Sequence, residues 1–134
     1  MFNHIVIGTS DIQQTQIFYD AVLGTLGVPK AAVSRLPAGP NRLFYRHGGM
    51  SFIITEPLDG KPATPANGGT IAFRCDSPDQ VQHFHDVAVA NGGLSIEDAP
   101  GVRHNPVVGD IYAAYVRDPD GNKLSATHRM ASNS

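Results

Sequence analysis

An internal repeat limits the folds that this chain can adopt. Residues 4–27 and residues 70–93 align without a gap at an offset of 66, and six of the 24 positions are identical. Both segments run from a short apolar stretch through a capping residue and an amphipathic stretch to a glycine. A repeat of this kind predicts two copies of one supersecondary unit that share a core. The identical pairs are Ile5/Ile71, Gln14/Gln80, Gln16/Gln82, Phe18/Phe84, Asp20/Asp86 and Gly27/Gly93.

Each copy carries the signals of a helix after its first strand. In the second copy, Ser77 is expected at the N-cap and Pro78 at the first helical position. In the first copy, Ser10 or Asp11 can supply the cap, and Gly24 is expected just beyond the C-terminal end of the helix. The sequence therefore predicts one amphipathic helix in each half.

Two hairpins are expected after these helices. The first joins strands Arg42–His47 and Met50–Thr55 through a two-residue turn at Gly48-Gly49. The second joins strands Ile111–Arg117 and Asn122–His128 through the four residues Asp118–Gly121, a sequence rich in turn formers. A four-residue turn here pairs Arg117 with Asn122.

Two segments rich in proline and glycine separate these elements. Residues 57–69 are expected to link a first unit, at about residues 1–56, to a second unit, at about residues 70–130. Residues 95–110 are expected to form a long loop that acts as a flap. The chain is thus predicted to be a single domain built from two units.

Composition narrows the partners and the location that we expect. Ten Lys and Arg against twelve Asp and Glu give a net charge of −2, so nucleic acid is not an expected partner. Neither a signal peptide nor a long apolar span is evident, which predicts a cytoplasmic protein that does not contact the membrane. Cys75 is the single cysteine and cannot form an internal disulfide or a cysteine-based zinc site. The six histidines are therefore the more numerous potential metal ligands, and the question is whether they form a metal site.

Three segments resemble the glyoxalase, bleomycin-resistance and extradiol-dioxygenase superfamily, which has the vicinal oxygen chelate fold. They are HIVIGTSDIQQTQIFYDAVLG, NGGTIAF and YVRDPDGNKL. The resemblance implies an α+β fold of two βαβββ units in a pseudo-twofold repeat, whose mixed sheet forms an open cup. It also implies a homodimer, since dimerisation often completes that cup. Members include metal-dependent lyases, isomerases and dioxygenases as well as proteins that sequester antibiotics.

Metal-binding members of this superfamily carry ligands, usually His or Glu, on the first and last strands of both units. The repeat places those four positions at His4, Ile53, Thr70 and Ser125. A catalytic zinc ion usually has three protein ligands with strong donor atoms, and one imidazole with two hydroxyls does not supply them. We therefore predict no metal and no other cofactor. The alternative is a divalent metal held by relocated ligands, with His104 or Glu56 recruited.

Strand alternation predicts which side chains line the cup. If His4 and Thr70 point inward, Arg74 also does, and the expected second hairpin sets Tyr112 across from Thr127, on the same face. Arginine suits the binding of carboxylate or phosphate, so the expected ligand is a small organic molecule, possibly anionic, with an apolar part. The predicted ligand-binding residues are His4, Arg46, Ile53, Thr70, Arg74, Tyr112 and Ser125.

The predicted function is the binding of this small molecule by a protein with a degenerate family metal site. Whether a reaction follows stays open, and the candidates for catalysis are His4, as a general base, and Tyr112, which would orient a substrate. Two alternatives are kept. One is a metal-dependent lyase, isomerase or dioxygenase with relocated ligands, and the other is a drug-sequestering protein without enzymatic activity.

Overall fold

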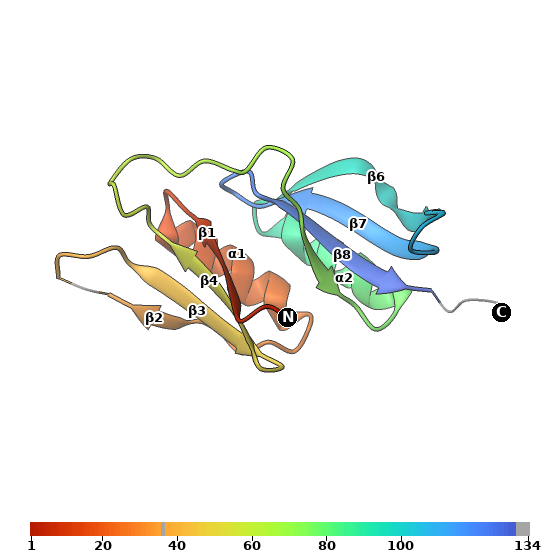
Figure 1. Ribbon diagram of the computed structural model, residues 1–134, viewed down its shortest axis with the longest axis horizontal. Helices are drawn as coiled ribbons and strands as arrows, with labels where there is room; N and C mark the ends of the chain where they lie inside the picture. The colour runs from red at the N-terminus through yellow and green to blue at the C-terminus, as the bar shows by residue number, and fades with distance from the viewer. Residues whose placement is uncertain (36, 131–134) are drawn as a thin grey trace.

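The computed structural model describes residues 1–35 and 37–130. Each half is one βαβββ unit, as Figure 1 shows. The first unit consists of β1 (His4–Gly8), α1 (Ile12–Gly24), β2 (Ala32–Ser34), β3 (Arg42–His47) and β4 (Met50–Thr55). The second consists of β5 (Ile71–Arg74), α2 (Pro78–Ala90), β6 (Leu94–Arg103), β7 (Ile111–Arg117) and β8 (Lys123–Arg129).

Each unit forms its own four-stranded mixed sheet. The strand orders are β1-β4-β3-β2 and β5-β8-β7-β6. The first strand of each unit pairs in parallel with the last, and the other pairs are antiparallel. Both helices lie on the same side of the two sheets and contact each other (Figure 1). The predicted α+β fold of two repeated units is confirmed, with two separate sheets. Neither helix of the described residues has the length and apolarity needed to cross a membrane.

The helix starts follow the predicted caps. Asp11 accepts a hydrogen bond from the backbone N–H of Gln14 at 3.1 Å, and α2 begins at Pro78 after the cap Ser77. The end of α1 differs, because Gly24 is the last helical residue and the left-handed conformation falls on Gly27, with φ +81°. Three i to i−3 hydrogen bonds continue the helical winding through residues 25–27, so the chain leaves the helix later than predicted.

The first hairpin agrees with the prediction and the second does not. His47 pairs with Met50 across the two glycines, both of which have positive φ. In the second hairpin, Arg117 pairs with Lys123, so the predicted pairing with Asn122 is wrong by one residue. The Asp118 carboxylate accepts the backbone N–H groups of Asp120 and Asn122, at 3.0 and 2.9 Å, which draws Asn122 into the turn.

The flap predicted at residues 95–110 is also wrong for most of its length. Strand β6 runs to Arg103, and residues 104–110 remain as a loop. The pairing of β6 with β7 shifts between Ile96 and Gly101, which marks a β-bulge. Because β6 is an edge strand, it accommodates Pro100 and Gly101 at this irregularity.

The turn that precedes β8 also ties the two units together. The hydroxyl of Tyr19, fully buried on α1, donates to Asp118 Oδ2 at 2.5 Å. Asp120 accepts from the backbone N–H of Ser10 at 2.9 Å and from the Thr15 hydroxyl at 3.0 Å. Burial is the main cause that raises the pKa of both Tyr19 and Asp118. This turn therefore forms a polar contact between the second unit and the first, at the edge of the shared apolar core.

Candidate functional site

The side of the first sheet that faces away from α1 carries His4, and we call it the His4 face. His4 lies opposite Ser51, which in turn lies opposite Arg46, and Phe44 lies opposite Ile53. These pairings of Arg46 and Phe44 are the ones that the predicted two-residue turn at Gly48-Gly49 requires, so that prediction is confirmed. His4 is exposed, and its Nδ1 atom lies 2.6 Å from Asn3 Oδ1.

The second sheet turns a different tyrosine from the predicted one toward this side. Tyr112 pairs with His128, not with Thr127, and it packs against the apolar core on the side of the helices. Its predicted place on the cup face is wrong. The extra residue in the turn shifts the pairing of β7 with β8 by one residue, and such a shift moves the side chains of β7 to the opposite face from the predicted one. Tyr115 pairs with Ser125 and takes that place.

We call the side of the second sheet that faces away from α2 the Tyr115 face, and it concentrates basic side chains. The strand registers turn five of the ten Lys and Arg of the chain toward it. Lys123 Nζ lies 5.0 Å from the centroid of the Tyr115 ring, and the Arg103 guanidinium carbon lies 5.8 Å from it. The five basic residues of this face are Arg74, Arg103, Arg117, Lys123 and Arg129.

The bulge of β6 is held by Arg103, one of the basic residues of the Tyr115 face. The Arg103 guanidinium donates to the carbonyl oxygens of Asp98, Ala99 and Gly101 at 2.9 to 3.1 Å, and so holds the bulge closed. Glu97, within the bulge, has φ +60°, a left-handed conformation that is unfavourable for this residue type. Its carboxylate lies 3.1 Å from Lys123 Nζ. One acidic side chain is therefore fixed beside the basic groups of this face.

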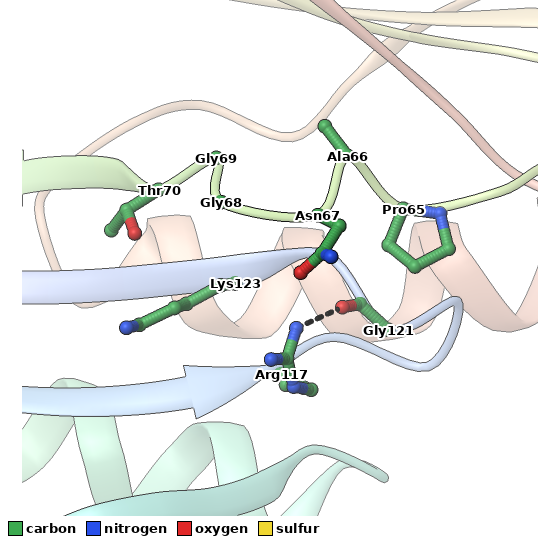
Figure 2. Close-up of a pocket in the computed structure, with 9 residues that line it drawn as sticks. All are labelled: Pro65, Ala66, Asn67, Gly68, Gly69, Thr70, Arg117, Gly121 and Lys123. Atoms are coloured by element: carbon green, nitrogen blue, oxygen red, sulfur yellow. Dashed lines mark hydrogen bonds between the residues drawn. The ribbon is translucent and has the colours of Figure 1, made fainter.

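A pocket of about 550 Å³ lies at the end of the linker and is lined in part by Arg117 and Lys123 of the Tyr115 face. Figure 2 shows the residues that line it. Thr70, one of the predicted ligand-binding residues, lines it together with Arg117 and Lys123. Arg117 Nη1 donates to the carbonyl oxygen of Gly121 at 2.8 Å, and the Asn67 side chain points toward the two basic groups (Figure 2). The pocket therefore combines cationic and neutral hydrogen-bonding groups.

Two of the four positions of the possible metal site, His4 and Thr70, lie apart within one chain. The Asn122 side chain lies 3.4 Å from the Gly8 carbonyl oxygen, and two residues later Leu124 pairs with Ile71. The start of β5, next to Thr70, therefore lies near the end of β1. His4 stands at the opposite end of β1, about 13 Å away along an extended strand.

Comparison with known proteins agrees with this two-unit architecture. The family model of the Glyoxalase/Bleomycin resistance protein/Dioxygenase superfamily matches residues 1–125. The chain belongs to this superfamily. A virulence protein of Salmonella typhimurium is 32% identical over 125 residues, which cover 91% of this chain and 79% of that protein.

Solved structures of the superfamily have the same fold. The crystal structure of a glyoxalase/bleomycin resistance protein from Albidiferax ferrireducens is 45% identical with a TM-score of 0.89, and the match covers 96% of this chain and 99% of that one. A glyoxalase-related enzyme from Fulvimarina pelagi is 20% identical with a TM-score of 0.69, over 96% and 88% of the two chains. The second likeness shows the fold alone.

The metal that many members of the superfamily use does not fit the corresponding residues of this chain. Ile53 has no donor atom, and the buried Ser125 hydroxyl lies 2.7 Å from the Thr127 hydroxyl. Among residues 1–35 and 37–130, no three His, Cys, Asp or Glu side chains gather in a way that could hold a metal ion. This donor set therefore does not supply the three strong protein ligands that a catalytic metal ion usually has.

The relocated ligands considered from the sequence lie elsewhere. Glu56 accepts the backbone N–H of Asn41 at 2.7 Å, which fixes it at the ends of β3 and β4. His104 is exposed in the loop after β6, with its Nδ1 atom 3.1 Å from Asp110. Cys75 is buried, and burial raises the pKa of its thiol to about 11, so it is a poor nucleophile at neutral pH.

The basic groups around Tyr115 are the part of the site that the sequence reasoning missed. The predicted flap at residues 95–110 contains Arg103, and Arg117 and Lys123 fall within the predicted strands Ile111–Arg117 and Asn122–His128. The signal that could have found them is the Asp-Pro-Asp-Gly-Asn sequence itself. An Asp that caps backbone N–H groups two and four residues later makes the turn longer by one residue, and this sets Tyr115 among the basic side chains.

Proposed function

We propose that the Tyr115 face binds a small organic anion that carries an apolar or aromatic part. The observation behind this proposal is the tyrosine ring flanked by Lys123 and Arg103, with Arg117 beside an open pocket. Ammonium and guanidinium groups bind a carboxylate through charge-assisted hydrogen bonds, and the half-buried Tyr115 ring offers a surface on which an apolar ligand body can pack. Both recognition elements lie within reach of one small molecule.

Glu97 competes with such a ligand for Lys123. Its carboxylate already lies 3.1 Å from the ammonium group, so a bound carboxylate must share Lys123 or displace Glu97. The Arg117 guanidinium has five N–H donors, one of which is bound to Gly121 in the structure. Arg117 is therefore the group that we assign as the main anion contact, and Glu97 is the group that limits affinity.

Calorimetric titration with benzoate tests this assignment. Arg117→Ala is expected to weaken binding about 10-fold, the loss of roughly one charge-assisted hydrogen bond. Glu97→Gln is expected to strengthen it several-fold, because the amide no longer neutralises Lys123. The two variants thus change the affinity in opposite directions.

Two controls separate this effect from a general change of charge. Lys30→Ala removes an exposed cation of the first unit and should leave benzoate affinity unchanged. Benzamide, which has the same ring without the charge, should bind the wild type more weakly than benzoate. Equal affinities of the wild type and Arg117→Ala for every small carboxylate tried would refute the proposal.

We further propose that two chains pair so that the His4 face of one covers the Tyr115 face of the other. Apolar side chains stand exposed on both faces, with Val6 47% and Leu94 63% exposed. The separation of His4 from Thr70 within one chain also favours a cup that a second chain completes. In such a pair, His4 and Arg46 of one chain would lie over Tyr115 of the other.

Light scattering tests the pairing. The wild type is expected at twice the chain mass of 14.3 kDa, and Val6→Glu is expected to yield the single-chain mass, because it places a charge in the covered face. A replacement of equal charge away from the face, Gln13→Glu on the exposed surface of α1, should leave the dimer intact. A wild type of single-chain mass at micromolar concentration would rule out the pairing.

A further inference from the structure

A hydrogen-bonded chain of four side chains lies on the helix side of the second sheet, away from the Tyr115 face. His85 Nε2 lies 2.8 Å from the hydroxyl of Ser95 on β6, and His85 Nδ1 lies 3.0 Å from Asp86 Oδ1. The Gln82 amide donates to the same Asp86 oxygen at 2.9 Å. Ser95 pairs with Val116, a core residue, so its side chain is directed toward α2 and not toward Tyr115.

This order of groups matches the requirements of an activated serine. The carboxylate that accepts Nδ1–H fixes the tautomer in which Nε2 carries the lone pair, and Nε2 then accepts the serine proton. The hydrogen bonds from His85 and Gln82 hold the pKa of Asp86 below its usual range, so this carboxylate is ionised at neutral pH. The His85 ring is only 13% exposed, which restricts its orientation.

The surroundings leave the hydroxyl open to a reagent. Ser95 is exposed and lies near the start of β6, the edge strand of its sheet. Along an edge strand, every second backbone N–H points away from the sheet and is available to an incoming oxyanion. Val89 lies one helical turn beyond His85 and is 44% exposed, so a short apolar acyl chain has a surface to pack against.

We propose that Ser95, His85 and Asp86 form an acyl-transfer site that accepts small activated esters with a short apolar acyl group. Ser95 Oγ bonds to the ester carbonyl carbon while its proton passes to His85 Nε2. The bond to the leaving oxygen then breaks, and that oxygen takes the proton from Nε2. Water repeats the sequence on the acyl-serine, which releases the carboxylic acid and restores Ser95. Ser95 and His85 are the catalytic residues, and Asp86 and Gln82 are positioning residues.

A fluorophosphonate probe with a short alkyl chain tests the site, because the serine oxygen displaces fluoride from phosphorus and keeps a stable adduct. Intact mass and peptide mapping of the full chain are expected to find one adduct, on Ser95. Ser95→Ala should take up none, and His85→Ala should react about 100-fold more slowly, the usual size of a general-base contribution. His83→Ala, which removes an exposed histidine of the same helix, should react at the wild-type rate.

The role of Asp86 has its own readout. Asp86→Asn is expected to lower the maximal labelling rate and to leave the half-saturating probe concentration unchanged, whereas a general disturbance of α2 would change both. Circular dichroism confirms that each variant is folded. The absence of an adduct on Ser95 overturns the proposal, as does a His85→Ala variant that reacts as fast as His83→Ala.

Discussion

Replacing Asp118 with Ala is expected to lower the free energy of unfolding by about 3 kcal/mol, because it leaves several buried donors without an acceptor. The carboxylate accepts from the fully buried Tyr19 hydroxyl, from two backbone N–H groups and from the Asn122 amide at 2.9 Å. These partners come from both units, so the loss affects the contact between them as well as the turn. Urea denaturation followed by circular dichroism measures the difference.

Two further variants make this result specific. Tyr19→Phe removes one donor of the same network and should cost about 1 kcal/mol. Asp59→Ala removes an exposed carboxylate that accepts one local backbone N–H, from Lys61, and should change stability by no more than about 0.5 kcal/mol. Unfolding of Asp118→Ala at the same urea concentration as Asp59→Ala would show that this turn does not hold the units together.

The difference in unfolding free energy between the wild type and Asp118→Ala is expected to depend on pH, in a direction that the pKa of Asp118 determines. Burial raises the pKa of Asp118, so the folded chain binds the Asp118 proton more tightly than the unfolded chain does. The contribution of Asp118 is therefore fully present below its ordinary value of 3.8 and declines as the pH rises through the folded pKa. The gap between wild type and Asp118→Ala should be wider below pH 3.8 than at neutral pH.

Replacing Gly93 with Ala is expected to lower the free energy of unfolding by about 2 kcal/mol or more. An added Cβ would stand 2.7 Å from the Ala88 carbonyl oxygen and 2.9 Å from the ring of Phe18. The first neighbour is the backbone at the end of α2 and the second is a fully buried ring of α1, so neither moves away at low cost. Thermal unfolding measures the loss.

Gly24→Ala is the matched control. It sits in α1 with nothing within 4 Å of an added Cβ, so the substitution should stabilise the helix by about 0.5 kcal/mol or leave it unchanged. Unfolding of Gly93→Ala at or above the midpoint of Gly24→Ala would contradict the close packing of Gly93 against Ala88 and Phe18. Gly93 is also one of the positions that the internal repeat preserves, opposite Gly27.

The first hairpin and the start of α2 were predicted from the sequence because each is determined by a few residues that are adjacent in the chain. The Gly48-Gly49 turn fixes the register of β3 and β4. Both glycines adopt positive φ, as a two-residue hairpin turn requires, and this turn pairs His47 with Met50. Ser77 and Pro78 likewise fix the start of α2. The register set by the Gly48-Gly49 turn places Arg46 and Ile53 on the His4 face, in agreement with the prediction.

The Tyr115 face depends on features that a pattern of residue types does not reveal. One additional residue in the turn before β8 decides whether Tyr112 or Tyr115 faces away from α2, since a shift of one residue reverses a strand. Strand β6 was missed because Pro100 and Gly101 are typical of loops, and only the unpaired edge of a sheet tolerates them within a strand. The clustering of Arg103, Arg117 and Lys123 results from the longer turn before β8 together with the extension of β6 to Arg103.

The surface that binds the ligand can be located directly by nuclear magnetic resonance of the uniformly ¹⁵N-labelled protein during titration with benzoate. Binding at the Tyr115 face predicts saturable shifts of the backbone amides of Tyr115, Arg117 and Lys123, with the same midpoint as calorimetry. Residues on the outer side of α1, such as Gln13, should not shift. Unchanged amides in β7 and β8 at saturating benzoate, with shifts confined to other strands, would contradict the placement of the site.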